Sequence, residues 1–308
     1  MKANASSEQI TGDFLVGSVM LLDQSHTFEK RIAMTVRLRL RSVFRLVESV
    51  AQKKKQDVDL VHRLRTESRR ADAALRIFSD WFSERRGKKL RQFLDDIRDK
   101  AGKVRDLDVL MFKLDKIRRS LSAELFRGLW DRAQTLRDRY RRILKRHCQA
   151  LNRHDLQKKM RNLIQSSRSI EPTPATASNP CFLTIQQRTD EYLSAVDSIV
   201  SELPCLHRIR ILGRRLRYSL ELLPEILPEA DTKSNCQVLS ELQEIIGQAV
   251  DQHLVLIFMQ SFELDCDSVT NTPSIRQAIS SLQEAIPAQI QAVMQQVIEK
   301  SKELSFTK

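Results

Sequence analysis

Hydrophobic residues recur along most of this chain at spacings of three and four, and stretches of strict alternation are absent. The first spacing is typical of amphipathic helices, whereas alternation is typical of half-buried strands. The sequence therefore predicts an all-α protein. The expected helices are 28–55, 58–84, 88–101, 105–121, 123–164, 182–202, a helix from Pro204 closed by Pro224 and Pro228, 237–262 and 274–303.

Residues that interrupt helices are concentrated near the middle of the chain. No proline precedes Pro172, whereas the segment 166–180 (SSRSIEPTPATASNP) contains three prolines and is rich in Ser, Thr and Ala. Such a segment does not continue a helix and is typical of a linker. We therefore expect an N-terminal segment (1–27), a first helical bundle (28–165), a linker (166–181) and a second helical bundle (182–308).

Two parts of the chain resemble each other at an offset of 145 residues. HRLRTESRRADAAL begins at residue 62 and HRIRILGRRLRYSL at residue 207. AGKVRDLDVL (101–110) and IGQAVDQHLV (246–255) align at the same offset, so that Gly102 and Asp106 match Gly247 and Asp251. Because the spacing is conserved over 45 residues, duplication of a helical unit is the simplest explanation.

Each repeated basic segment predicts a helix with one cationic and one apolar face, at 100° per residue. The cationic faces contain His62, Arg65, Arg69 and Arg76 in the first helix, which fall within about 60° of one another, and His207, Arg210, Arg214 and Arg217 in the second. Arg70 and Arg215 widen these stripes on one flank. The apolar faces, predicted to lie in the core, contain Val61, Leu64, Ala71, Ala74, Leu75 and Phe78, and Leu206, Ile209, Leu212, Leu216, Leu220 and Leu223.

The charge distribution indicates a polyanionic ligand. The net charge is +13, but residues 1–168 carry +20 and the remainder carries −7. Like charges four residues apart on a helix cost about 0.2–0.5 kcal/mol per pair, so an external anion would relieve the stripes. Arginine suits phosphate because its planar guanidinium stays charged and binds in a bidentate manner. Histidine either donates a hydrogen bond or gains charge as the pH approaches about 6.5.

The alternative is that the arginines pair with acidic residues on neighbouring helices, for which Asp99, Asp106, Asp108 and Asp251 are candidates. Exposed pairs of this kind contribute only about 0–1 kcal/mol. Such pairs do not explain why arginine recurs at matching positions of the two copies.

Several other functions are disfavoured by what the sequence lacks. The stripes carry almost no aromatic residues on which nucleobases could stack, Tyr218 being the exception. No H-x-x-x-H pair, P-loop or glycine-rich phosphate loop occurs, so we expect neither an enzyme nor a resident metal or cofactor. Five scattered cysteines without a C-x-x-C pair favour a reducing, cytoplasmic location. The apolar run Phe14–Leu22 is too short to span a bilayer, and we expect it to pack on the bundle or form a short helix.

The combination of motifs resembles the CHAD domain, the conserved histidine α-helical domain. The first copy contains H-x-x-R-x-x-x-R-R, followed about 40 residues after the histidine by G-x-x-R-D-x-D-V. The second contains H-x-x-R-x-x-x-R-R-x-R-Y and G-x-x-x-D. The resemblance covers the chain from about Phe28.

This resemblance implies two four-helix bundles related by a pseudo-twofold, with the basic helices facing each other across a central channel. It also implies binding of inorganic polyphosphate, often at polyphosphate granules, without catalysis by the domain itself. By position, the implied ligand residues are His62, Arg65, Arg69, Arg70, Arg76 and Arg105 in the first half, and His207, Arg210, Arg214, Arg215, Arg217 and Tyr218 in the second.

The two copies differ at two of the positions that match the family pattern. Asp72 stands where the second copy has Arg217, so the first stripe is expected to lose a charge and the second to be the stronger. Val250 stands where the first copy has Arg105. An RNA or DNA binder that uses the basic first half, and a scaffold without affinity for polyphosphate, therefore stay open as alternatives.

Overall fold

The computed structural model describes residues 27–53, 58–151, 153–167, 180–200, 202–227, 231–265 and 272–305. These residues contain helices and no strand, which confirms the predicted all-α class. The α-helices are α2 (Phe28–Gln52), α3 (Val58–Ile77), α4 (Glu84–Lys116), α5 (Ala123–Ala150), α6 (Arg153–Ile164), α7 (Pro180–Asp197), α8 (Leu203–Leu220), α9 (Leu223–Ile226), α10 (Lys233–Asp265) and α11 (Thr272–Ser301), with short 3-10 turns at Ser79–Trp81 and Arg118–Ser120.

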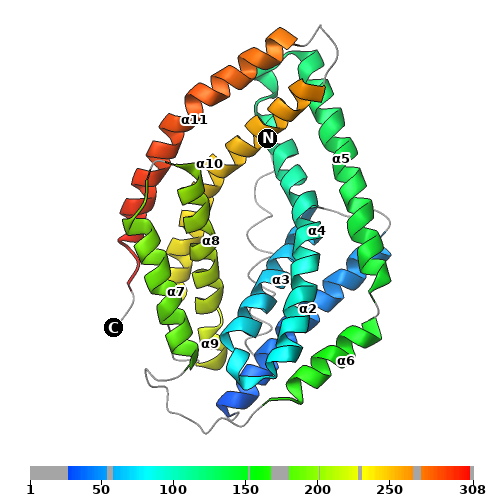
Figure 1. Ribbon diagram of the computed structural model, residues 1–308, viewed down its shortest axis with the longest axis vertical. Helices are drawn as coiled ribbons and strands as arrows, with labels where there is room; N and C mark the ends of the chain where they lie inside the picture. Colours follow the sequence, from blue (N-terminus) through cyan, green and yellow to red (C-terminus); the bar gives the residue numbers. More distant parts are fainter. Residues whose placement is uncertain are drawn as a thin grey trace, which may run out of the picture.

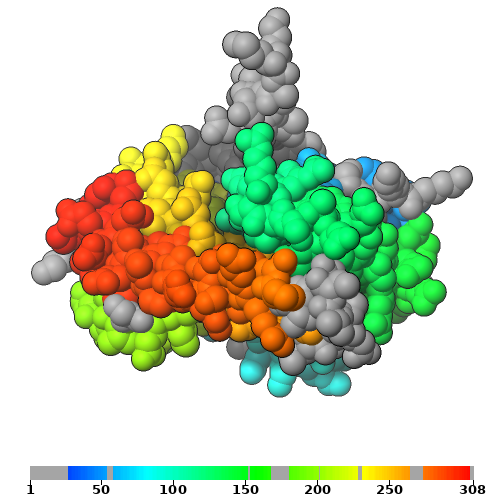
Figure 2. Space-filling view, turned by 90° about the horizontal axis from the view of Figure 1, so that it is seen from above, coloured from blue at the N-terminus to red at the C-terminus, as the bar shows by residue number. Residues whose placement is uncertain are grey.

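The helices form two groups that lie side by side (Figure 1). In the first group α2 packs on α3, α3 on α4, α4 on α5, and α5 back on α2. In the second group α7, α8, α10 and α11 make the same closed series of contacts. The view from above shows α11 and α10 covering one side of the molecule and α5 the other (Figure 2). The expected pseudo-twofold relation and the boundaries of the two bundles stay predictions.

The core contains the apolar faces predicted for the two repeated helices. Val61, Leu64, Ala71, Ala74, Leu75 and Phe78 are buried in the first group, and Leu206, Ile209, Leu216, Leu220 and Leu223 in the second, whereas Leu212 is half-buried. Burying these side chains leaves the polar faces of α3 and α8 turned away from the hydrophobic core.

The two groups touch along α3 with α8 and α4 with α10. Ion pairs between described residues cross this boundary. Arg39 pairs with Glu225, Arg70 Nε lies 2.9 Å from Glu221 Oε2, and Lys113 Nζ lies 3.6 Å from Asp251 Oδ2. The basic faces of α3 and α8 are thereby held next to each other.

Several predicted helix boundaries were wrong. The helices expected at 88–101 and 105–121 are one helix, α4, which runs through Gly102. A glycine inside a helix costs only about 0.5–1 kcal/mol, and the packing of α4 against both α3 and α5 exceeds that cost. The expected helix 123–164 is divided into α5 and α6, because the extended residue Leu151 ends α5 and α6 then packs on α2 and α4.

Two further boundaries differ from the prediction. The helix expected to reach residue 84 ends at Ile77, because Trp81 and Phe82 are buried in a turn that follows it. Pro224 does not close the preceding helix but occupies the first turn of α9, where its missing N–H costs nothing. The run Phe14–Leu22 and most of the predicted linker lie outside the described residues.

Candidate functional site

Four predicted arginines meet where α3 lies against α8. Arg65 and Arg69 come from α3, and Arg210 and Arg214 from α8. Each of these side chains is partly buried. The charges of other members lower the pKa of Arg69 (Arg65 and Arg210), of Arg210 (Arg65) and of Arg214 (Arg69, Arg210 and Arg65). We call these four residues the central cluster. The structure therefore brings together the middle positions of both predicted stripes.

The inner pair of the central cluster, Arg69 and Arg214, has no carboxylate partner among the residues that the structure describes. Burial, followed by the charge of Arg65, lowers the pKa of Arg69 to about 10, although its hydrogen bond to the Tyr218 hydroxyl opposes this effect. Burial, followed by the charges of Arg69 and Arg210, lowers the pKa of Arg214 to about 9. Both side chains are still cationic near neutral pH, at a position where positive charge is unfavourable.

The arginines of the outer pair lie against the repeated glycines and near the repeated aspartates. The Arg65 guanidinium lies against Gly102 of α4, where an added Cβ would be 3.5 Å from Nη2, and Arg65 Nη1 lies 3.1 Å from Asp106 Oδ1. Arg210 lies against Gly247 of α10 in the same way, with a corresponding distance of 3.3 Å. The first arginine of each stripe is thus held flat against the following helix.

The repeated aspartate of the second copy also lies near the first arginine of its stripe. Asp251, the counterpart of Asp106, raises the pKa of Arg210 electrostatically, and it forms an ion pair with Lys113. The Nε atoms of Arg65 and Arg210 are both buried without a hydrogen-bond partner. The alternative of pairing with neighbouring acids therefore applies to the outer arginines and not to the inner ones. Asp108 pairs with Arg137 and Arg141 of α5 instead.

His62 and His207 are exposed near the N-terminal ends of α3 and α8, each as the fifth residue of its helix. Burial and then the charge of Arg105 lower the pKa of His62, and burial with Arg210 and Arg214 lowers the pKa of His207. Both imidazoles are consequently neutral at pH 7 in the free protein. The predicted residue Arg105 lies close enough to the first histidine to join it at one end of the cluster.

Asp72 and Arg217, which occupy matching positions of the two copies, each form an ion pair within their own helix. The acidic residue comes first in α3, and the basic residue comes first in α8. In α3, Asp72 Oδ2 accepts from Arg76 at 3.0 Å, and in α8 Arg217 donates to Glu221 Oε1 at 2.6 Å. Arg76 and Glu221 match each other at the offset of 145, so both residues of the pair are exchanged. Each helix therefore carries an ion pair at this position, and the expectation that the second stripe is the stronger stays a prediction.

The predicted residues Arg70, Arg217 and Tyr218 interact with other side chains of the protein. Arg70 is paired with both Glu67, at 2.8 Å, and Glu221, at 2.9 Å. The Arg217 guanidinium lies 4.7 Å from the centre of the Tyr218 ring, and Tyr218 is only 5% exposed. The sequence contained a signal for the exchanged pairs, because Asp72 and Arg76, like Arg217 and Glu221, are four residues apart.

One basic residue near the site was missed in the sequence. Arg188 of α7 donates a hydrogen bond to Ser219 Oγ of α8, one turn beyond Arg215. Burial, followed by the charges of Arg76 and Arg215, lowers the pKa of Arg188 to about 10. Its counterpart at the offset of 145 is the buried Val43, so the internal repeat could not indicate it.

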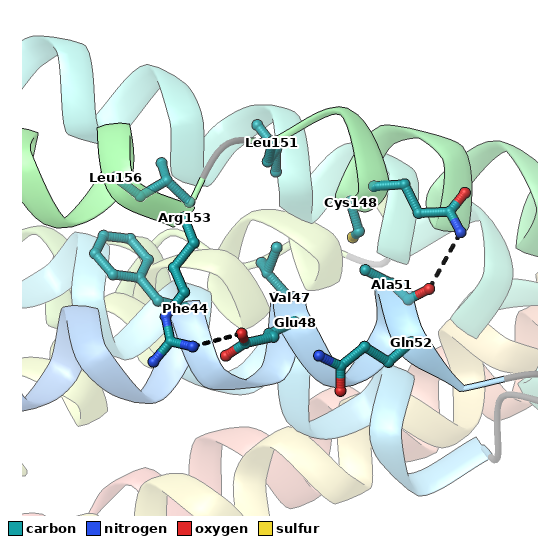
Figure 3. A pocket seen from close by; sticks show the side chains of 10 residues that line it. Phe44, Val47, Glu48, Ala51, Gln52, Cys148, Leu151, Arg153 and Leu156 are labelled. Atoms are coloured by element: carbon teal, nitrogen blue, oxygen red, sulfur yellow. Dashed lines mark hydrogen bonds and ion pairs between the residues drawn. The ribbon is translucent and has the colours of Figure 1, made fainter.

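Two pockets lie apart from the central cluster. The first, of about 320 Å³, is bounded by α2, α5 and α6, with Phe44, Cys148 and Leu156 on its wall and the Glu48–Arg153 ion pair at its edge (Figure 3). The second, of about 430 Å³, is lined by Ser83, Arg85, Arg86, Lys89 and Ser166. None of the twelve predicted ligand residues lines either pocket.

Comparison with known families identifies the chain. The CHAD domain family matches residues 35–260, which is most of the chain, and the protein belongs to this family. Two solved structures share its fold. The CHAD domain from the plant Ricinus communis is 17% identical with a TM-score of 0.71, over 92% of this chain and 94% of that one. PptA from Streptomyces chartreusis is 15% identical with a TM-score of 0.66, over 89% of this chain and 99% of that one.

No curated protein matches the sequence closely enough to assign a function by similarity. Within the described part of the chain, no helix has the length and apolar character needed to cross a membrane.

Replacement of the two repeated glycines tests how the outer arginines are held. Gly102→Ala should stabilise the protein by about 0.5–1 kcal/mol, because alanine favours the helix and its Cβ makes an ordinary contact with Arg65. Gly247→Ala should give a smaller gain, since its Cβ would displace the Arg210 guanidinium by a few tenths of an ångström. Urea unfolding measures both changes. Equal gains would contradict the proposed contact of Arg210 with Gly247.

Proposed function

We propose that this protein binds inorganic polyphosphate, without catalysing its turnover, at the arginines of the central cluster. The observation that carries the proposal is the position of Arg69 and Arg214. They come from different halves and lie close enough to repel each other, and neither has a carboxylate partner among the described residues. An anion is the group that such a site lacks. Membership of the CHAD family supports the same ligand, because the resemblance in sequence motifs implies polyphosphate.

The chemistry of guanidinium groups fits a chain of phosphates. Each phosphate unit carries negative charge and exposes oxygens, so one chain could contact arginines from α3 and α8 at once. Charge-assisted hydrogen bonds of this kind are about twice as strong as neutral ones, and partial burial of the arginines limits screening by salt. We therefore assign the main phosphate contacts to Arg65, Arg69, Arg210 and Arg214, with His62, His207 and Arg105 at one end.

A nucleic-acid ligand is less well supported. In the described residues α3 has no aromatic side chain, and the only one of α8, Tyr218, is buried. Single-stranded nucleic acids usually stack their bases on exposed aromatic rings. The site could thus hold the phosphates of such a ligand but offers no surface for its bases. We propose that the protein acts in the cytoplasm, and at polyphosphate granules where these form.

Charge reversal at the inner pair tests the proposal. Arg69→Glu combined with Arg214→Glu should weaken polyphosphate binding at least about 100-fold, because two charge-assisted contacts worth about 1.5–3 kcal/mol each are lost. Calorimetric titration at two salt concentrations measures the affinity. Affinity of the unaltered protein should fall steeply with salt, as expected when several counterions are released.

A matched control changes the same number of charges elsewhere. Arg139→Glu combined with Arg142→Glu alters two exposed arginines of α5, and it should reduce the affinity much less. If both double variants bind equally well, polyphosphate does not bind at the central cluster. If single-stranded RNA displaces polyphosphate at equal charge concentration and fixed salt, the nucleic-acid alternative is favoured.

Polyphosphate affinity should also rise as the pH is lowered. The pKa values of His62 and His207 lie below 6.5 in the free protein, and a neighbouring phosphate chain would raise them. The complex then binds more protons than the free protein, so affinity increases as the pH falls from the raised pKa values of the complex toward those of the free protein, and it levels off below the latter. Titrations between pH 8 and pH 5.5 measure this change. His62→Gln with His207→Gln should remove most of it; an unchanged pH profile would exclude the histidines from the site.

A further inference from the structure

The exchange of Asp72 and Arg76 for Arg217 and Glu221 makes the two flanks of the central cluster different. One flank contains Arg70 and the α8 pair, and the other contains Arg215 and the α3 pair. If the copies had kept the same polarity, both flanks would carry similar charge. Because of this exchange, the two flanks of the central cluster differ in charge.

The flank around Arg70 is neutral and closed. Glu221 accepts from both Arg70 and Arg217, at 2.9 and 2.6 Å, and Glu67 accepts from Arg70 at 2.8 Å. Two cations and two anions therefore compensate each other, and the side chains of Arg70, Arg217 and Glu221 are each only 18% exposed. A phosphate arriving here would have to displace a carboxylate that is already held by two arginines.

The flank beside α7 is cationic and open. Arg188 reaches across from α7 to Ser219 of α8, and the Ser219 hydroxyl in turn donates to the Arg215 carbonyl oxygen at 2.7 Å. Arg215 is exposed, and α3 packs against α7 on this side, with Arg76 48% exposed.

The carboxylates near this flank do not compensate its charge. Asp72 is divided between Arg76 and Arg98, each at 3.0 Å, and Asp95 is paired with Arg98. Glu191 accepts a hydrogen bond from Gln187 at 3.0 Å and raises the pKa of Arg188 less than Asp72 does. Positive charge therefore exceeds negative charge on this flank.

We infer that a polyphosphate chain leaves the central cluster over α7, where Arg188, Arg76 and Arg215 bind its next phosphates. The opposite flank, where Glu67 and Glu221 neutralise the arginines, ends the site. This inference rests on the proposed function, and it assigns Arg188 as a ligand that neither the sequence motif nor the internal repeat indicates. A chain long enough to extend beyond the central cluster would bind more tightly than one that fills it.

Neutralising the α7 flank tests the inference. Arg188→Gln combined with Arg215→Gln keeps hydrogen-bond donors but removes two charges. The affinity for long-chain polyphosphate should fall by about tenfold or more, and the slope of log affinity against log salt should decrease by about 1.4–1.8, as expected for two lost phosphate contacts. The affinity for tripolyphosphate, which the central cluster alone could hold, should change less than about twofold, within what a distant charge contributes.

The control is Arg139→Gln combined with Arg142→Gln, which removes the same charge from exposed positions of α5. Since Arg188 is partly buried, Arg215→Gln alone, at an exposed position, provides a variant that should not disturb folding. If the α7-flank variants keep the salt slope of the control while Arg69→Glu with Arg214→Glu abolishes binding, the inference is wrong and the proposed function stands. If the unaltered protein does not bind polyphosphate, both are wrong.

Discussion

Repulsion among four arginines at the contact of α3 and α8 is the constraint around which this protein is organised. The apolar faces of the two helices bury residues such as Leu64 and Leu216 in the hydrophobic core, and this packing holds the cationic faces together. Hydrophobic burial of this kind contributes about 1.5–3 kcal/mol per large side chain, enough to hold an electrostatically unfavourable centre. The fold thus maintains a concentration of positive charge that an isolated helix would avoid.

The surroundings of the cluster reduce this repulsion unevenly. The outer arginines, Arg65 and Arg210, lie against glycines and next to Asp106 and Asp251, which lowers their electrostatic cost. Among the residues that the structure describes, the inner arginines have no carboxylate partner, and Tyr218 alone of the named neighbours opposes the lowering of their pKa values. The unsatisfied charge is therefore concentrated on two residues, one from each half, and a polyanion that bridges the halves would contact both.

The internal repeat accounts for the parts of the site that are alike in the two halves. Departures from the repeat account for the difference in charge between its two flanks. The basic stripe, the glycine and the aspartate recur at the offset of 145. The ion pair at the end of each stripe differs, because Asp72 and Arg76 of α3 correspond to Arg217 and Glu221 of α8. Arg188 has no counterpart of its own kind in the first half. A duplicated scaffold has in this way acquired one neutral flank and one cationic flank.

Helical periodicity predicted the helical class and the apolar faces, because it determines which residues share a face. That the two stripes face each other was implied only by the resemblance to the CHAD domain. The sequence did not predict that α4 runs through Gly102, since the packing of α4 against α3 and α5, which exceeds the cost of a glycine inside a helix, depends on the tertiary structure. It also did not show which arginines are neutralised. Arg70 pairs with Glu221, 151 residues away, and such a contact depends on how the two halves pack.

The most direct test is the thermal unfolding midpoint of an Arg69→Gln, Arg214→Gln double variant, measured with and without polyphosphate. It shows whether repulsion between these arginines destabilises the free protein and is relieved by the ligand. Without polyphosphate at low salt, the variant should have a higher unfolding midpoint than the unaltered protein, because like-charge repulsion is removed. With saturating polyphosphate the order should reverse, because only the unaltered protein gains the full binding free energy. A lower midpoint for the variant without polyphosphate, or equal stabilisation of both proteins by it, would contradict the account.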